Sequence, residues 1–216
     1  MRILITAGGT REYIDPVRFI SNASSGRMGF ELARAAVKDG HKVTLITTVD
    51  CDLRLLNQAK IVKVESAAEM FEAVKKHFEK CDCLIMAAAV ADYAPAQKSK
   101  VKIKKQKRDL VIKLKPTADI LKWAGKNKKV KRGKGQRQIV VGFALEDKNL
   151  RQNAEKKLKE KNLDMIVANS LSAIGSSKST VHIKTPDTLW IVIENETKAA
   201  TARKIIHLMA DHAWTK

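Results

Sequence analysis

Short apolar runs alternate with amphipathic segments along most of the chain. The segment 3–9 opens with the β-branched run ILIT and ends in a glycine pair, which indicates a strand that enters a tight turn. Between 28 and 36 the apolar residues recur at helical spacing, and Gly40 marks the end of the predicted helix. Alternation of strand and helix is typical of a parallel sheet with helices on both faces.

The same alternation continues toward the C-terminus. It predicts strands at 41–48, 84–90, 139–142 and 164–169, helices at 66–80, 148–161 and 197–213, and a hairpin at 180–194. Ser66, followed three residues later by Glu69, is a capping box for the helix at 66–80. We therefore expect one α/β domain over residues 1–216, with a Rossmann-like, doubly wound, mostly parallel sheet and a C-terminal hairpin plus helix.

The middle of the chain alternates lysines with apolar residues. At 102–105 and again at 110–115 this alternation predicts two paired strands, a basic β-ribbon whose neighbouring lysines would repel one another until a polyphosphate binds. Thr117 is predicted to cap a helix that begins within 116–121. Residues 126–137 are almost all Lys, Arg, Gly and Gln, and we expect them to form an exposed connection with little regular structure.

The formal net charge of +19 comes mostly from residues 98–137. Such a segment could bind RNA, an acidic partner or a triphosphate. A nucleic-acid-binding protein would interleave aromatic residues with the lysines for base stacking, and Trp123 alone lies in this segment. Nucleic acid is therefore the less favoured partner, and most of these lysines are expected to form a solvated surface.

Other features restrict the class of protein. No apolar run approaches the length of a membrane span, and a strand begins after two residues, so we expect no signal peptide, no membrane partner and a cytoplasmic location. Cys51, Cys81 and Cys83 lack the spacing of zinc ligands and are expected to be buried free thiols. The five histidines are scattered along the chain, so no metal cluster is predicted.

The loop at 10–26 is unusually long and rich in hydrogen-bonding side chains, which favours a functional role. Ser24, Ser25 and Gly26 precede the first predicted helix, where free amide groups and the helix dipole would attract a phosphate. For the two serines alone, simple helix capping is the alternative. The pattern GxGxxG is absent and Thr47-Thr48 end the second strand, which argues against a nicotinamide-dependent reductase.

Several motifs occur in the order found in one enzyme family. TAGGTRE at 6–12, IDPVRFISN at 14–22 and SSGRMG at 24–29 closely resemble the opening of phosphopantothenoylcysteine synthetase, which joins phosphopantothenate to cysteine in coenzyme A biosynthesis. AAVADY, KIKK, GFALE and DMIVAN follow in the family's order. Ala118 stands where the family has proline, and Leu145 where it has alanine. The resemblance covers nearly the whole chain and is to the bacterial, CTP-dependent type in a stand-alone form.

The resemblance implies a role for each matching residue. Asn22 corresponds to the family's catalytic asparagine, whose amide can hold the acyl phosphate intermediate and donate to developing negative charge. The phosphate of phosphopantothenate would lie near Ser24, Ser25 and Gly26. The residues that would line the nucleotide site are Gly8, Gly9, Ala87, Ala88, Asp92, Lys102, Ala118, Asp119, Ile120, Leu121, Phe143, Lys157 and Lys161.

The resemblance also implies a reaction in two steps. The carboxylate of 4′-phosphopantothenate would attack the α-phosphate of CTP, giving an acyl cytidylate and pyrophosphate, and the amine of cysteine would then displace CMP. Mg²⁺ is expected on the triphosphate, held mainly by phosphate oxygens. Many bacterial members are fused behind a flavin-dependent decarboxylase domain, but this chain begins at the synthetase strand, so we expect no FMN. Members of the family are dimers, so a homodimer is expected.

Overall fold

The computed structural model describes residues 1–50, 58–105, 107, 109–129 and 137–214. Cys51 and most of the predicted connection at 126–137 lie outside the described residues. The helices are α1 (Arg27–Lys38), α2 (Ala67–Phe78), α3 (Ile120–Lys126), α4 (Leu150–Glu160) and α5 (Lys198–Trp214), with a 3₁₀ turn η2 at Leu171–Ala173. The strands of the central sheet are β1 (Arg2–Ala7), β4 (Lys42–Thr47), β5 (Lys60–Lys63), β6 (Cys83–Met86), β9 (Ile139–Glu146), β10 (Met165–Ser170), β11 (Lys178–Lys184) and β12 (Ile191–Thr197).

The central sheet has eight strands in the order β12-β11-β10-β9-β6-β1-β4-β5. The six strands from β10 to β5 are parallel, and β11 and β12 add an antiparallel hairpin at one edge. Counted along the chain, the parallel strands follow the Rossmann order, in which the direction of winding reverses between β1 and β6. This strand order confirms the predicted Rossmann-like fold class. Ligands of such sheets bind beyond the carboxyl ends of the strands, at the point where the winding reverses.

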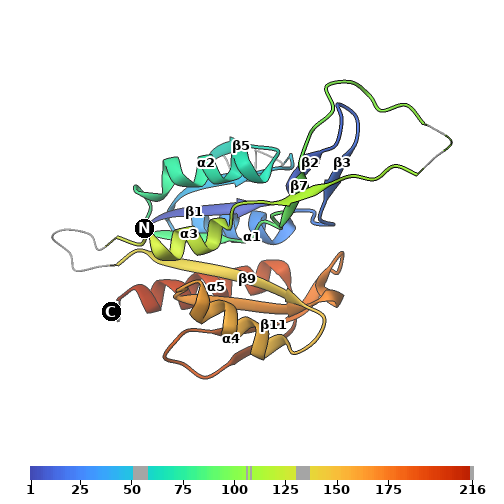
Figure 1. The fold of residues 1–216 in the computed structure, drawn as a ribbon. Helices are drawn as coiled ribbons and strands as arrows, with labels where there is room; N and C mark the ends of the chain where they lie inside the picture. The colour runs from blue at the N-terminus through green and yellow to red at the C-terminus, as the bar shows by residue number, and fades with distance from the viewer. Residues whose placement is uncertain (51–57, 106, 108, 130–136, 215–216) are drawn as a thin grey trace.

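Each face of the sheet carries its own hydrophobic core. Ile3 and Ile5 point to the face covered by α1 and α5, while Leu4 points to the face covered by α2, α3 and α4. Figure 1 shows α2 and α4 near opposite ends of the sheet, with the strands between them. Because successive side chains of a strand point to opposite faces, both faces of β1 are apolar, as expected for a parallel sheet buried on both sides.

Two small ribbons stand outside the central sheet. β2 (Arg11–Tyr13) pairs with β3 (Phe19–Ser21), and β7 (Tyr93–Pro95) pairs with β8 (Leu114–Pro116). They lie together at one side of the molecule, where the described residues between β7 and β8 extend away from the sheet (Figure 1). The loop predicted at 10–26 thus contains a hairpin, which the sequence pattern did not reveal because each of its strands has only three residues.

The predicted basic ribbon is wrong in its pairing. Residues 102–105 form no strand, and of the segment 110–115 only the end enters β8, whose partner is β7. Alternation of lysine with apolar residues predicts a strand only if the apolar face is buried. On the apolar faces of the predicted strands, Val101 is 72% exposed and Leu110 is 56% exposed, so no well-buried face fixes a register.

Other boundaries also differ from prediction. The strand predicted at 84–90 ends at Met86, and residues 87–90 form a loop in which Ala89 makes a single bridge to Gly9. Asp119, and not Thr117, caps α3, because its carboxylate accepts the amide N–H of Lys122 at 2.9 Å. β5 lacked a clear pattern and was not predicted.

The chain closes on itself just before β9. The amide of Lys129 donates to Oε1 of Gln138 at 2.9 Å, and the amide of Gln138 donates back to the carbonyl of Lys129 at 3.0 Å. The buried side chain of Gln138 also donates to the carbonyls of Phe78 and Cys81 at 2.6 and 3.0 Å. The base of this connection is therefore fixed to the end of α2.

A buried ion pair stands next to this closure. Lys128, predicted to be exposed, has a side chain only 2% exposed, and its Nζ lies 2.9 Å from Oδ2 of Asp164. The same carboxylate oxygen accepts the amide N–H of Val140 at 2.8 Å. Lys128 therefore neutralises a carboxylate that joins β9 to the start of β10.

Candidate active site

A cavity of about 560 Å³ opens at the carboxyl ends of β6, β9 and β10, beside the start of α1. Six separate stretches of the chain line it: 22–28, 86–92, 117–121, 143–145, 157–161 and 169–175, of which all but the fifth follow or end a strand. Lys198 at the start of α5 completes the lining. The cavity therefore lies where the fold predicts a ligand site.

Most of the residues predicted for the site line this one cavity. They are Asn22, Ser24, Ser25, Gly26, Ala87, Ala88, Asp92, Ala118, Asp119, Ile120, Leu121, Phe143, Lys157 and Lys161. Gly8, Gly9 and Lys102 do not line it. Lys102 lies exposed on the extension between β7 and β8, beside the β2–β3 hairpin.

Gly8 and Gly9 do not line the cavity but pack against segments next to it. Gly8 has a φ of +89°, and a β-carbon on it would lie 2.2 Å from Oγ1 of Thr48. A β-carbon on Gly9 would lie 2.6 Å from the carbonyl oxygen of Asn22. Both positions require glycine because the backbone turns and neighbouring chain segments approach closely. Gly8 therefore allows close packing against Thr48, and Gly9 allows close packing against the backbone of Asn22.

The start of α1 is held against the end of β1. A β-carbon on Gly29 would lie 2.5 Å from Cβ of Ala7, so only glycine allows the helix this close to the strand. Gly26 is the N-cap residue with a φ of 75°, and no side chain caps the helix; Oγ of Ser24 accepts the amide of Gly26 at 3.4 Å. The first amide groups of a helix have no acceptors inside it, so this end of α1 suits an anion.

Asn22 is anchored to the loop after β6. Its Nδ2 donates to the carbonyls of Ala89 and Val90, each at 3.2 Å. Two further bonds join the same segments: the amide of Ala91 donates to Oγ1 of Thr10 at 2.9 Å, and the amide of Thr10 donates to the carbonyl of Ala89 at 3.2 Å. Because Nδ2 of Asn22 donates to these two carbonyls, the amide oxygen is the atom left to accept a hydrogen bond from a ligand.

Lys157 in the last turn of α4 and Lys161, which caps the end of that helix, provide positive charge on one wall of the cavity. Nζ of Lys157 donates to the carbonyl of Phe143 at 2.8 Å, and Nζ of Lys161 lies 2.8 Å from Oδ2 of Asp119. Burial and then the neighbouring Lys161 lower the pKa of Lys157, against the opposing effect of nearby carboxylates. Burial raises the pKa of Asp119, but hydrogen bonds from Lys161 and the amide of Lys122 outweigh it and lower the pKa overall.

A second pair of cations was missed in the sequence. Arg27 and Lys198 both line the cavity, and Nζ of Lys198 donates to the carbonyl of Ala173 at 3.1 Å. Burial and the charge of Arg27 lower the pKa of Lys198. Arg27 stands inside the SSGRMG motif and was therefore predictable from the sequence, whereas Lys198 carries no local signal, because only the fold brings it to α1. Asn169, the last residue of DMIVAN, also lines the cavity.

The described part of the chain contains no helix whose length and apolar character would let it span a membrane. Among the same residues, no group of three or more His, Cys, Asp or Glu side chains is placed to hold a metal ion. Cys81 and Cys83 are buried, as predicted, and burial raises the pKa of the Cys83 thiol well above its ordinary value.

Several known proteins are similar in sequence to this chain. A protein called cysteine/cysteine sulfinic acid decarboxylase, from an unknown prokaryotic organism, is 51% identical over 176 residues, which cover 81% of this chain and 47% of that protein. The coenzyme A biosynthesis bifunctional protein CoaBC of Borreliella burgdorferi is 43% identical over 212 residues, covering 96% of this chain and 52% of the relative. This chain thus spans about half the length of the curated relatives it matches.

Solved structures and family profiles agree with these relatives. The crystal structure of the C-terminal domain of a coenzyme A biosynthesis bifunctional protein CoaBC superposes with a TM-score of 0.78 at 39% identity, covering 96% of this chain and 93% of that one. The family profile described as the DNA/pantothenate metabolism flavoprotein C-terminal domain matches residues 1–212. On this evidence the chain belongs to the family of DNA/pantothenate metabolism flavoprotein C-terminal domains.

Proposed function

We propose that this chain is a phosphopantothenate–cysteine ligase of coenzyme A biosynthesis, with CTP as the activating nucleotide. The observation that carries the proposal is the shared cavity, in which Asn22, the start of α1 and the lysines of α4 face one space. A volume of about 560 Å³ is within the usual range for small-molecule sites. The likeness to the C-terminal domain of CoaBC supports the same assignment.

The first step in this proposal is activation of the acid. The carboxylate of 4′-phosphopantothenate attacks the α-phosphate of CTP, its oxygen forms the new P–O bond, and pyrophosphate leaves with the bonding electron pair. Lys157 and Lys161 neutralise charge on the nucleotide, and Phe143 offers a half-buried face beside them. Because reactants held in one cavity need not meet by diffusion, positioning supplies much of the rate.

The second step forms the amide. The amine of cysteine attacks the acyl carbon, CMP departs with its bonding electron pair, and the amine loses a proton. Asn22 stands where it can orient this step, since its Nδ2 is held by Ala89 and Val90 and its oxygen can accept from the incoming amine. The amide can also donate to the intermediate if it releases one of these carbonyls.

The acid's own phosphate is proposed to lie at the start of α1. Ser24, Ser25 and Gly26 provide hydroxyl and amide donors there, and Arg27 and Lys198 add two positive charges at the same end of the cavity. Like charges so close together are unfavourable until an anion lies between them. This assignment places the substrate with its phosphate toward α1 and its carboxylate toward Asn22.

Mg²⁺ is proposed to enter with the nucleotide. Asp92 and Asp119 are the acidic side chains among the described residues that line the cavity, and Asp119 is paired with Lys161. Such a donor set fits an ion that is coordinated largely by phosphate oxygens and water. Bound there, Mg²⁺ would neutralise charge on the triphosphate. We propose no FMN in this reaction.

We further propose a homodimer that acts in the cytoplasm. The ribbons outside the main sheet expose large apolar side chains: Phe19 is 42% exposed and Tyr93 is 54% exposed. A second copy of the chain could cover this surface, and light scattering coupled to size exclusion would measure the assembly. A monomer at micromolar concentration would contradict this part of the proposal.

Pyrophosphate release tests the activity directly. Purified protein is given phosphopantothenate and Mg²⁺ with either CTP or ATP, with and without cysteine. We expect pyrophosphate with CTP in the absence of cysteine, and CMP together with the amide product only when cysteine is added. Absence of pyrophosphate release with both nucleotides would refute the ligase. Tight, salt-resistant RNA binding without turnover would support the nucleic-acid-binding alternative, and oxidation of NADH or NADPH would support a reductase.

A further inference from the structure

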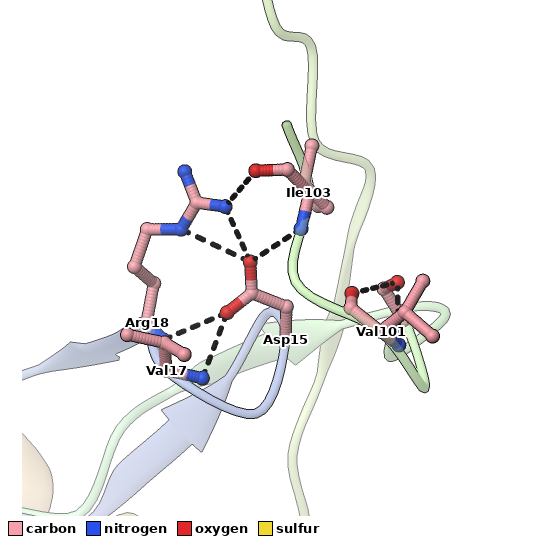
Figure 2. Close-up of polar contacts among 6 residues, drawn as sticks. Asp15, Val17, Arg18, Val101 and Ile103 are labelled. Carbon is pink, nitrogen blue, oxygen red and sulfur yellow. Dashed lines mark hydrogen bonds and ion pairs between the residues drawn. The ribbon is translucent and has the colours of Figure 1, made fainter. Parts of the chain in front are cut away.

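Asp15 stands in the turn between β2 and β3 and is completely shielded from solvent. Oδ1 accepts the amides of Val17 and Arg18 at 2.8 and 2.9 Å, which fixes the turn. Oδ2 accepts Nε of Arg18 at 3.0 Å and the amide of Ile103 at 3.1 Å, and Nη2 of Arg18 contacts both Oδ2 and the carbonyl of Ile103 (Figure 2). The carboxylate therefore joins its own turn to a segment more than eighty residues away in the chain.

The bonds to Ile103 hold both backbone polar groups of that residue. Oδ2 of Asp15 accepts the N–H of Ile103, and Nη2 of Arg18 donates to its carbonyl. Both backbone polar groups of Ile103 are therefore paired, as they would be between two strands of a sheet. Burial raises the pKa of Asp15, but hydrogen bonds from the amides and from Arg18 outweigh it and hold the pKa well below its ordinary value. Because Arg18 balances its charge, Asp15 does not compete with a triphosphate for nearby lysines.

Further contacts fix the chain just before Ile103. The amide of Ser99 donates to the carbonyl of Ile14 at 2.9 Å, and Nζ of Lys98 lies 4.8 Å from the ring centre of Tyr13. Oγ of Ser99 donates to the carbonyl of Val101 at 2.6 Å. Residues 98–103 are thus tied to the β2–β3 hairpin at several points, and Lys102 lies between two anchored neighbours.

The other end of the hairpin leads into the cavity. β3 ends at Ser21, directly before Asn22, whose amide is bonded to the loop after β6. The hairpin is seated on the body of the protein by the amide of Arg11, which donates to the carbonyl of Glu65, and by Glu12, which accepts the amide of Ala67 at 2.8 Å. The hairpin is therefore a rigid link between Asn22 and the segment that carries Lys102.

We propose that Asp15 is a positioning residue for the nucleotide: by holding Ile103 it sets where the Lys102 backbone stands relative to Asn22. This inference rests on the proposed function and on the contact between Lys102 and the triphosphate that the family resemblance implies; Lys102 itself does not line the cavity. Without the link, residues 98–103 would have to be ordered when the nucleotide binds, and that ordering entropy would weaken nucleotide affinity. The site for phosphopantothenate, at the start of α1, would be unaffected.

Asp15→Asn tests the link with little change in shape. An amide cannot accept at both positions, so its NH₂ group would face either the N–H of Ile103 and the guanidinium or the amides of the turn. Glu12→Gln is the matched control: it is a buried carboxylate on the same hairpin, and an amide oxygen can keep its single bond to Ala67. Arg18→Lys is a second variant, which keeps the charge but loses the two-pronged contact.

Two measurements separate positioning from simple loss of stability. In Asp15→Asn we expect the KM for CTP to rise about tenfold while the KM for phosphopantothenate stays within about twofold, with a smaller rise in Arg18→Lys and none in Glu12→Gln. In the free protein, the amides of Ser99 and Ile103 should exchange hydrogen faster in Asp15→Asn, with those of β1 unchanged.

Each outcome decides between explanations. Equal changes in both KM values, or an unchanged KM for CTP in an active enzyme, would overturn the positioning role and leave the ligase intact. If Asp15→Asn does not fold, Arg18→Lys alone decides, and an unchanged KM for CTP there would overturn it. Absence of pyrophosphate release by the wild type would refute the ligase and this role together, while faster exchange at Ile103 would still establish the mechanical link.

Discussion

Replacing Asn22 by aspartate changes one atom and inverts the local electrostatics. In the wild type, Nδ2 donates to the carbonyls of Ala89 and Val90. In Asn22→Asp a carboxylate oxygen would face these two carbonyl oxygens, so two hydrogen bonds are lost and repulsion replaces them. The side chain should turn away from the loop after β6, and the amide oxygen that we assign to the second step should no longer be held in place.

The size of the effect follows from the two bonds. A neutral hydrogen bond contributes about 0.5–1.5 kcal/mol net, so loss of the two bonds costs about 1–3 kcal/mol, which corresponds to a factor of about 5 to about 160 in rate. Asn22 is exposed, so global stability should change little and the thermal midpoint should stay within a few degrees. Asn22→Ala loses the same bonds and also the side-chain oxygen that we assign to the second step, so its amide formation should be impaired as well.

The assay compares the two half-reactions. Pyrophosphate release without cysteine reports formation of the acyl nucleotide, and CMP release after cysteine is added reports its consumption. We expect Asn22→Asp either to form the intermediate slowly or to let it persist, with amide product reduced in both cases. Ser21→Ala, which alters the neighbouring exposed hydroxyl, should behave as wild type. Wild-type rates of both half-reactions in Asn22→Asp would refute the reasoning.

Three further predictions concern lysines. Lys102→Gln should weaken CTP binding by about 1.5–3 kcal/mol, the contribution of a charge-assisted contact; equal affinity by titration calorimetry would contradict the role. Because the pKa of Lys157 is lowered, CTP affinity should fall as pH rises through a range below that of an ordinary lysine, and Lys157→Arg should move this fall to higher pH in the same titration. Lys128→Met leaves Asp164 buried without its cation, which should cost about 3–5 kcal/mol and lower Tm by about 6–20 °C. Lys129→Met, which removes an exposed pair, should change Tm by less than about 4 °C, and equal losses in both variants would contradict the argument from burial.

Much of the fold was readable because the parallel strands are apolar on both faces. The runs that became β1, β4, β9 and β10 were found within a few residues, since most of their side chains are apolar. The third strand was predicted too long because residues 87–90 are apolar, yet they leave the sheet and line the cavity. Apolar character alone cannot separate a strand from a ligand-facing loop of small residues.

The candidate site was predictable where motifs are continuous in sequence, and less so where the fold assembles it. Asn22 and Lys157 were predicted from the family resemblance, and both line the same cavity. Lys198 is brought to α1 only by the packing of α5 against it, which no local pattern encodes. Lys102 was predicted on a paired strand, but its extension is held by Asp15, a long-range contact that periodicity cannot express.

The reciprocal bonds between Lys129 and Gln138 have a practical use. Since these two residues close their own ring of hydrogen bonds, the start of β9 does not depend on how many residues join them. Lys129 and Gln138 lie at the amino end of the sheet, whereas the candidate cavity lies at its carboxyl end. A fluorescent reporter or an affinity epitope inserted between these two residues would therefore label the protein for binding studies at a point away from the proposed site.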